Sequence, residues 1–458
     1  MSDRRKPILF LSHLAGTASG AELSLLETVR YLKANTEFDP VVIIPAEGTL
    51  YEALRALGCK VYVLSYNWWT DDHPTSSTEL QGITRHNARA IEQINFIIST
   101  LRPVACITNT MVAPWLAYAS ALQKVPHVWQ LTEFGTSAHA IDFILTEDQV
   151  LRTVNELSDK IIVNSLAMQR HYAALLPRHR QSIDVAYPYV APPPAAPSIS
   201  PGAESDSFNL VAVGHIKPSK GQLDAVQALQ VLRDAHGISA NLCLVGSIED
   251  EAYFKKIKSF ITKHKLTRLV QFAGYSSQPH QFLRRADIAL VCATNEAFGR
   301  VAIEPPLAGV PVIGTRSGGV QETIDDGKTG LLYEPGNITE LVKSILHFKN
   351  DPVFAATTVD AAQRKYYRLY ALDKVHQPLV AYLRGIPAAN SLDLRLLGGI
   401  FTLNDEYEQK LTKLANEALA LKAAHEQLMA IKNSRKWRLV SKIGRGVAAV
   451  RNLLSKIR

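Results

Sequence analysis

The chain has 458 residues, of which 47% are hydrophobic and 20% charged, and a formal net charge of +8; this composition is typical of a globular protein and not of a disordered one. The chain is longer than a single domain with one hydrophobic core usually is, so we expect at least two domains. No apolar run approaches the roughly 20 residues that span a bilayer, and four cysteines without a C-x-x-C pair argue against a disulfide framework or a zinc site.

The positive charge lies mainly in one segment. Residues 432–458 contain nine Lys and Arg and no acidic residue, whereas the other residues carry 41 basic and 42 acidic side chains. The sequence therefore predicts a nearly neutral body and a basic segment.

Two parallel α/β domains are predicted from the alternation of short apolar runs with segments of helical periodicity. We expect a first Rossmann-like domain at 1–188, a proline-rich linker at 189–207 and a second Rossmann-like domain at 208–360. The strands expected in the first domain are Ile8–Leu11, Val41–Pro45, Val61–Leu64, Ala105–Ile107, Val125–Trp129 and Lys160–Ser165. Those expected in the second are Phe208–Val213, Asn241–Val245, Val270–Gly274, Ile288–Ala293 and Val310–Gly314.

The segment Val291–Asn337 is dense in glycine and contains Glu296, Glu304 and Glu322. Its pattern predicts a strand, a loop, a short helix from Val301, a second strand and a Gly-Gly loop. Because ligands bind beyond the carboxyl ends of the strands in an open parallel sheet, both loops fall at the edge where ligands bind.

Glu296 and Glu304 flank the start of that short helix. Backbone N–H groups at Phe298, Gly299 and Arg300 would suit a phosphate or a sugar hydroxyl there. Two carboxylates that accept hydroxyls, with phosphate between them, would fit a nucleotide sugar. Two solvated glutamates near a helix N-terminus have the same spacing, so the spacing alone is not specific.

The residues around this pair resemble the signature of retaining glycosyltransferases of the GT-B fold, glycosyltransferase family four. The matching positions are Glu296, Phe298, Gly299, Glu304, Gly309, Pro311-Val312-Ile313, Gly318-Gly319, Glu322, Gly327, Gly330 and Leu331-Leu332. The resemblance extends over roughly residues 5–385 and implies two Rossmann-like α/β domains facing across a cleft. It also implies that helices at 361–388 cross back onto the first domain.

The resemblance further implies a donor site for a nucleoside-diphosphate sugar. Lys220 would offset the charge of the departing diphosphate, Glu296 would orient the donor sugar, and Glu304 would hold the ribose. No cofactor or metal is expected. The donor-binding residues expected together are Gly20, His215, Lys220, Glu296, Phe298, Gly299, Arg300 and Glu304.

The donor site departs from the family pattern at three places. Gly20-Ala21 stands where the family has two glycines, and His215 stands where it has an arginine that holds the diphosphate. Lys217 or Arg300 can compensate for that arginine. Pro305 and Pro306 follow Glu304, so the helix must start late, be short or bend.

The acceptor is expected on the first domain, with Glu133 and Trp68 as candidate contacts. Thr132-Glu133 stands where the family usually has a histidine followed by an acid. Trp68 and Trp69 follow a predicted strand and could stack on a sugar, but a packing wedge is the interpretation we favour. His127 within a strand is expected to be structural.

Residues 389–431 and 432–458 are expected to be helical. The first segment has a heptad seam from Tyr407 to Leu428, which fits either self-association into a homo-oligomer or a helix lying on the enzyme body. In the second, an apolar stripe from Trp437 to Ile457 opposite basic residues favours an anionic membrane surface over nucleic acid, and a solvated face remains an alternative.

We therefore expect a retaining, metal-independent glycosyltransferase, cytoplasmic and peripheral on the inner face of the cytoplasmic membrane. It would move a sugar onto a glycan or lipid-linked glycan, in cell-envelope polysaccharide synthesis. One alternative is a glycoside hydrolase, whose two carboxylates would face each other about 5–9 Å apart across the scissile bond. The other is a non-catalytic scaffold that binds nucleotide sugar or glycan.

Overall fold

The computed structural model describes residues 5–17, 19–70, 76–135, 141, 143–194 and 208–386. Contacts divide the chain into two compact units, and one of them, Met1–His73 with Arg85–Asp393, contains every described strand. The other unit, Pro74–Thr84 with Leu394–Arg458, includes the predicted heptad segment from 394 onward and the basic segment, which lie outside the described residues, as does most of the predicted linker.

The first domain contains a seven-stranded parallel sheet with the order β3-β2-β1-β4-β5-β6-β7. Its strands are β1 (Lys6–Leu11), β2 (Phe38–Ile44), β3 (Lys60–Val63), β4 (Ala105–Asn109), β5 (His127–Leu131), β6 (Lys160–Val163) and β7 (Asp184–Val185). Its helices are α1 (Gly20–Asn35), α2 (Thr49–Ala56), α3 (Ser77–Leu101), α4 (Trp115–Gln123), α6 (Glu147–Leu157) and α7 (Leu166–Leu175), with a 3-10 turn at Pro177–His179.

Both faces of this sheet are covered, which explains its continuous apolar strands. Successive residues of β1 from Ile8 to Leu11 are all fully buried. The side chains of Ile8 and Phe10 pack with α1 and α2, whereas those of Leu9 and Leu11 pack with α3 and α4 on the other face. Alternation along one strand therefore supplies two hydrophobic cores.

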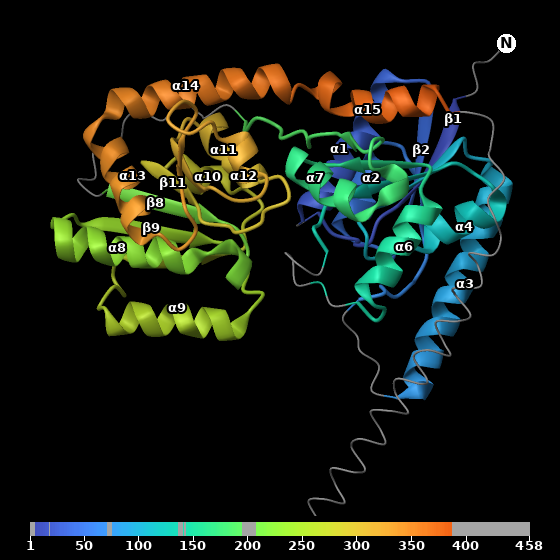
Figure 1. Ribbon diagram of the computed structural model, residues 1–458, viewed down its shortest axis with the longest axis horizontal. Coiled ribbons are helices and arrows are strands. Elements are labelled where there is room, and N and C mark those ends of the chain that lie inside the picture. The colour runs from blue at the N-terminus through green and yellow to red at the C-terminus, as the bar shows by residue number, and fades with distance from the viewer. Residues whose placement is uncertain are drawn as a thin grey trace, which may run out of the picture. The chain divides into compact units, whose positions relative to one another are not determined.

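The second domain contains a six-stranded sheet with the order β10-β9-β8-β11-β12-β13. Its strands, all parallel, are β8 (Phe208–Val213), β9 (Ala240–Val245), β10 (Val270–Gly274), β11 (Ile288–Val291), β12 (Val312–Thr315) and β13 (Leu331–Tyr333). Its helices are α8 (Gln222–His236), α9 (Glu251–Lys263), α10 (His280–Leu283), α11 (Arg300–Leu307), α12 (Val320–Thr323), α13 (Ile338–Asn350) and α14 (Pro352–Leu369). The prediction of two parallel α/β domains is confirmed (Figure 1).

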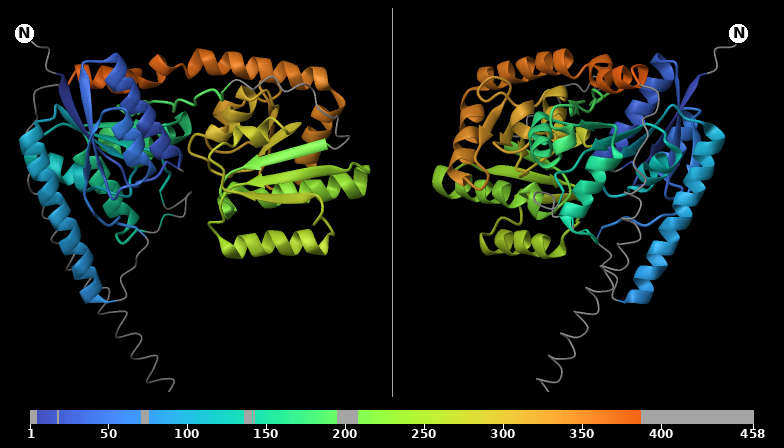
Figure 2. Two further views of the ribbon diagram at one scale, coloured as in Figure 1. Left: turned by 180° about the vertical axis from the view of Figure 1, so that it is seen from behind. Right: turned by 45° about the vertical axis from the view of Figure 1, so that its right-hand side comes forward.

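The last described helix, α15 (Leu372–Arg384), packs against the first domain. Its residues Leu379, Val380 and Leu383 belong to the same buried cluster as β1 and α1. It follows α14 directly, and α14 packs against α11 of the second domain (Figure 2). The chain thus returns to the first sheet after completing the second.

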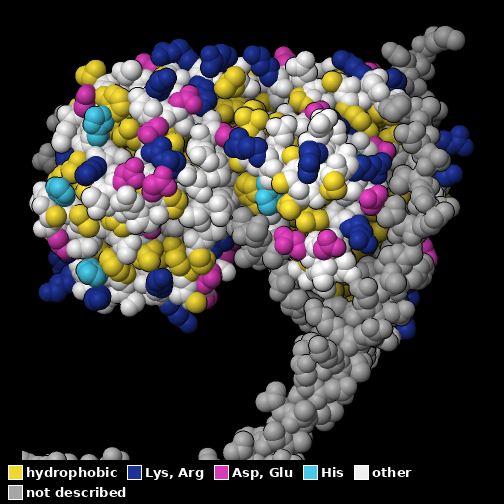
Figure 3. All heavy atoms as spheres, viewed as in Figure 1, with side chains coloured by type: hydrophobic (Ala, Val, Ile, Leu, Met, Phe, Trp, Pro, Cys, Tyr) yellow, Lys and Arg dark blue, Asp and Glu magenta, His cyan; other side chains and the backbone are white. Residues whose placement is uncertain are grey.

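Charges of both signs are mixed on one face of the described surface (Figure 3). On the face drawn in Figure 3, Lys and Arg side chains of the described residues are interspersed with Asp and Glu. This distribution agrees with the near balance of 41 basic and 42 acidic side chains outside residues 432–458.

Candidate functional site

The strand order of each sheet reverses at one point. In the first domain the reversal lies between β1 and β4, and in the second between β8 and β11. Loops that follow such strands diverge and leave a crevice at the carboxyl edge of the sheet, where ligands bind. Lys220 follows β8 and Glu296 follows β11, so the two residues predicted to be catalytic stand on either side of the second reversal.

A cavity of about 540 Å³ is lined by residues of both domains. Its size lies within the usual range of small-molecule sites, about 300–1,000 Å³. The first domain contributes Thr17, Ser19, Gly20, Ala21, Leu23, Ser24, Thr132, Glu133, Asn164 and Pro188. The second domain contributes Val213, Gly214, His215, Lys217, Lys220, Val245, Gly246, Tyr275, Ser276, Ser277, Pro279, Glu296, Ala297, Phe298, Gly299, Arg300, Val301 and Glu304.

This lining brings together all eight residues predicted to contact the donor and one of the two predicted to contact the acceptor. The missing one is Trp68, which does not line the cavity. Its indole N–H donates to the His13 carbonyl oxygen at 2.9 Å, and its ring packs 5.3 Å from the His13 ring. Trp68 also packs against the buried cluster that includes residues of α3 and α4. These contacts agree with a packing role for Trp68.

Lys220 and Glu296 form an ion pair in the wall of the cavity, with 2.6 Å between Lys220 Nζ and Glu296 Oε2. Both side chains are about one-fifth exposed, so a ligand in the cavity can reach them. A 3-10 turn at Pro218–Lys220 places the lysine, and Gly221 follows in the left-handed conformation. A Cβ at Gly221 would lie 2.1 Å from the Cys292 carbonyl oxygen, so only glycine allows this approach of the two loops.

The Gly-Gly loop supports Glu296 from the other side. The Gly319 N–H donates to the Glu296 carbonyl oxygen at 2.7 Å. A Cβ at Gly319 would come within 2.6 Å of the Ala297 carbonyl oxygen. The backbone of the loop with Glu296 is therefore held by direct contact with another stretch of backbone, and a side chain at Gly319 would separate them.

Helix α11 carries Arg300 near its start and Glu304 in its middle. It is eight residues long and contains Pro305 and Pro306, as expected for a helix that proline keeps short. An Arg300 guanidinium N–H donates to the Tyr189 carbonyl oxygen at 2.7 Å, which ties the start of α11 to the segment that leaves the first domain. Burial raises the pKa of Glu304, and the charge of Arg300 acts in the opposite direction.

His215 lines the cavity at the position where the family resemblance predicts an arginine. Its Nδ1 lies 2.7 Å from Ser247 Oγ and 3.2 Å from a Glu249 carboxylate oxygen. Burial lowers the pKa of His215, and Glu249 opposes this effect. Lys217 is also paired with Glu249, at 2.7 Å. Glu249 thus engages both His215 and Lys217, and Lys217 is one of the two residues expected to compensate for the missing arginine.

Glu133 is the acidic side chain of the first-domain wall. It is partly buried, and desolvation raises its pKa while the neighbouring His13 lowers it. His127 lies in the interior instead: it is 1% exposed and its ring nitrogens contact Thr108 Oγ1 and the Leu157 carbonyl oxygen. Desolvation lowers the His127 pKa to about 3, as expected for a neutral structural histidine.

Two residues that had no role in the predictions from the sequence lie at the cavity or at the contact between the domains. Asn164 lines the cavity directly after β6. Its place at the end of an apolar strand could have indicated this position from the sequence. Glu322, which matched the family pattern without a role, accepts hydrogen bonds from the Leu166 and Ala167 N–H groups at the start of α7. No sequence pattern indicated this contact between domains.

The described residues contain no group of His, Cys, Asp and Glu that could hold a metal ion. The four cysteines are free thiols. Among the described helices, none is both long enough and apolar enough to span a bilayer.

Residues 199–366 match the family described as glycosyl transferases group 1. A glycogen synthase of Mycobacterium tuberculosis is 28% identical over 275 residues, which cover 57% of this chain and 61% of that protein. An N-acetyl-alpha-D-glucosaminyl L-malate synthase of Bacillus anthracis is 28% identical over 173 residues, or 38% of this chain and 44% of that protein. The chain thus spans less than two thirds of the length of these relatives.

Solved structures match over more of the chain. The HepE protein of Anabaena, crystallised with UDP and glucose, superposes with a TM-score of 0.67 at 23% identity, covering 83% of this chain and 100% of that one. A mutant of TarM from S. aureus, in complex with fondaparinux, alpha-GlcNAc-glycerol and UDP, superposes with a TM-score of 0.63 at 13% identity, covering 82% of this chain and 99% of that one. At these identities the likeness shows the fold. The similarity to glycosyl transferases group 1 thus covers residues 199–366, and the two described domains have the GT-B fold.

Proposed function

We propose that the protein is a retaining glycosyltransferase that transfers a sugar from a nucleoside-diphosphate sugar to a hydroxyl group of a glycan or lipid-linked glycan. The observation that carries this proposal is the Lys220–Glu296 ion pair in a cavity shared by both domains. A diphosphate would take the lysine as its counter-charge and leave the carboxylate to accept hydroxyls of the donor sugar.

The proposed reaction breaks the bond between the anomeric carbon and the diphosphate oxygen and forms a bond from that carbon to the acceptor oxygen. The acceptor hydroxyl loses its proton, and the departing diphosphate takes it up. Lys220 and Arg300 offset the negative charge that develops on the leaving group. Both domains hold their substrates in position, which accounts for much of such a rate enhancement.

A uridine nucleotide is the donor to test first, since HepE of Anabaena was crystallised with UDP and with UDP-glucose. The resemblance supports transfer with retention of configuration and without a metal ion. The cell-envelope role, the membrane contact through residues 432–458 and self-association through residues 389–431 are proposals that rest on the sequence alone. So does a cytoplasmic position on the inner face of the cytoplasmic membrane.

The test is turnover of UDP-glucose, UDP-galactose, UDP-N-acetylglucosamine and GDP-mannose in the presence of EDTA, with and without glycan acceptors. We expect nucleotide release that increases with acceptor and a product of the same anomeric configuration by NMR. Lys220→Ala should lower kcat about 100-fold or more, by analogy with the loss of one charge-stabilising group. Lys255→Ala, on the exposed side of α9, is the matched control and should retain activity.

Two outcomes would contradict the proposal. Release of free sugar that no acceptor suppresses would favour the hydrolase. Binding of the nucleotide sugar without any turnover, unchanged by Glu296→Gln, would favour the non-catalytic scaffold.

A further inference from the structure

The two walls of the cavity differ in charge. The second-domain wall contains Lys217, Lys220 and Arg300 together with Glu296 and Glu304, whereas the described first-domain residues that line the cavity include no Lys or Arg. The charged side chain of that wall is the carboxylate of Glu133. A substrate that lies across the cavity therefore meets both cations and carboxylates on the second-domain side, and a carboxylate without a Lys or Arg on the first-domain side.

Further acidic charge lies behind the first-domain wall. Glu22 is fully buried in the first turn of α1 and is paired with His13, with 2.8 Å between His13 Nδ1 and Glu22 Oε1. Glu22 and Glu133 interact unfavourably and His13 offsets part of that charge. Two carboxylates against one imidazole leave this side of the cavity unsuited to a second anion, because like charges in a partly desolvated site repel strongly.

Glu133 and Asn164 offer acceptors to a ligand at this wall. An ionised Glu133 carboxylate only accepts, and it already receives one bond from the Thr132 N–H at 3.2 Å. Asn164 Nδ2 points to the Thr132 carbonyl oxygen, at 3.5 Å. Asn164 Oδ1 is buried and has no hydrogen-bond partner among the described residues. Such a buried acceptor calls for a donor from a ligand or from water.

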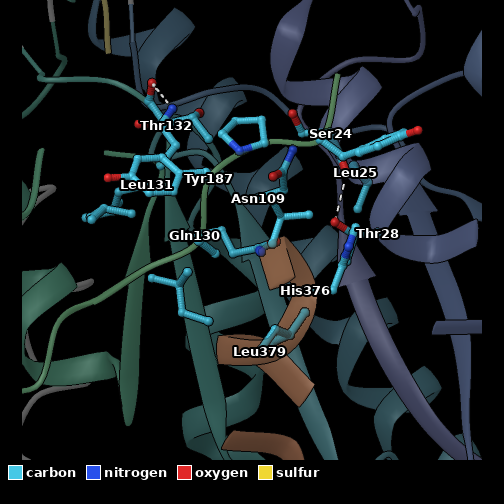
Figure 4. A pocket seen from close by; sticks show the side chains of 17 residues that line it. Ser24, Leu25, Thr28, Asn109, Gln130, Leu131, Thr132, Tyr187, His376 and Leu379 are labelled. Atoms are coloured by element: carbon cyan, nitrogen blue, oxygen red, sulfur yellow. Dashed lines mark hydrogen bonds between the residues drawn. The ribbon is translucent and has the colours of Figure 1, made fainter. Parts of the chain in front are cut away.

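A smaller cavity of about 50 Å³ adjoins this wall and shares Ser24, Thr132 and Asn164 with the main one. Figure 4 shows Asn109 between Thr132 on one side and Ser24 on the other, with His376 of α15 below. The space suffices for a few water molecules, at about 10–15 Å³ each, and not for a sugar ring. A substrate ring therefore fits the main cavity only, where Glu133 and Asn164 line the wall.

We propose that the group which binds to the first-domain wall is an uncharged sugar ring whose hydroxyls donate to Glu133 and Asn164, without phosphate or carboxylate. The inference rests on the proposed function and narrows its acceptor. A hydroxyl donates and accepts, whereas a phosphate dianion only accepts and would face the acidic charge of this wall. The protein would then extend an existing neutral glycan and would not act on a phosphorylated sugar.

The test measures binding to the protein saturated with UDP, so that phosphate groups cannot occupy the site at Lys220. The ligands are glucose, galactose, mannose and N-acetylglucosamine, each compared with its own 6-phosphate by saturation-transfer NMR and calorimetry. At least one neutral sugar should bind about tenfold or more tightly than its 6-phosphate, given the cost of juxtaposed like charges.

Three variants sharpen the test. Glu133→Lys should lower the affinity for the neutral sugar and raise the affinity for its 6-phosphate. Glu133→Gln should make the two affinities similar without reversing their order. Glu52→Lys makes the same charge change on the exposed side of α2 and should leave both affinities unchanged. Glu52→Lys should bind UDP within about twofold of the parent, since distant sites act independently, and the two Glu133 variants are compared at saturating UDP.

The proposal is overturned if the parent binds a 6-phosphate more tightly than its neutral partner, if no neutral sugar binds, or if Glu52→Lys has the effect of Glu133→Lys. A failure of the proposed function is distinguishable, because it would appear as no UDP binding or as no transfer with any acceptor.

Discussion

The two walls of the cavity are built in different ways. On the second-domain side, the loops after β8, β11 and β12 rest on one another through backbone, and glycines at 221, 318 and 319 allow the contact. On the first-domain side, Glu133 and Asn164 follow two neighbouring strands, β5 and β6, and the pairing of these strands brings both residues to the cavity. The second-domain wall is held by contacts between backbone segments, whereas the first-domain wall consists of individual polar side chains from separate strands.

The difference indicates where each kind of substrate can vary. A diphosphate is common to many donors, so a wall made of fixed backbone and Lys220 needs little adjustment between them. Acceptors differ in shape and charge, and a wall of individual side chains can change one residue at a time. Specificity for the acceptor should therefore reside on the first domain.

The largest effect is expected for Gly319→Ala. Gly319 has a φ of −74°, which alanine adopts easily, so the substitution tests the close contact alone. A Cβ 2.6 Å from the Ala297 carbonyl oxygen must displace the loop with Glu296. We expect transfer to fall about 100-fold or more, because small misplacements of reacting groups have such effects, and stability to fall by about 1–3 kcal/mol.

Steady-state kinetics and urea unfolding measure the two effects. Gly82→Ala in α3 is the matched control, since a Cβ there meets nothing within 4 Å, and it should unfold at an equal or higher urea concentration. If Gly319→Ala kept full activity, the backbone contact would not be what positions Glu296.

A smaller effect is expected at Glu322, where the domains meet. Its side chain is 10% exposed and accepts hydrogen bonds from two N–H groups that begin α7. Glu322→Ala leaves these donors unpaired and removes a negative charge from a helix N-terminus. Urea unfolding should show a loss of about 1–3 kcal/mol, and the KM for the donor should rise because the domains are held together less well.

Glu92→Ala, at an exposed position of α3, is the control for Glu322→Ala. An unchanged stability in both variants would show that the contact between α12 and α7 contributes nothing in solution.

The two walls also differ in how well the sequence predicts them. The strands around β1 and β8 were predictable because their continuous apolar runs reflect burial on both faces. The second-domain site was predictable because its glycines and charges lie within one short stretch, Val291–Asn337, plus Lys220. Glu322 binding to α7, and Trp68 packing on His13 instead of lining the cavity, depend on residues more than 50 positions apart. No local pattern records such pairings.

The smallest effect is expected where α15 returns to the first domain. Arg384 donates to Glu37 through two nitrogens, at 3.2 and 3.0 Å, and these bonds lower the pKa of Glu37 from 4.5 to about 2. A lowered pKa in the folded state means that the pair stabilises the protein above pH 4.5 and that this contribution is lost as the pH falls toward 2. Both side chains are exposed, so Glu37→Gln should lower the Tm at pH 7 by no more than about 2 °C.

The decisive measurement is the difference in Tm between the parent and Glu37→Gln across pH 3 to 7 at low salt. That difference should shrink as the pH falls below 4.5, because protonation of Glu37 makes the parent resemble the variant. It should also shrink in 1 M salt, which screens an exposed pair. We expect the burial of Leu379, Val380 and Leu383 in the core of the first domain to hold α15 in place more strongly than this ion pair. A large difference in Tm that changes neither with pH nor with salt would contradict this.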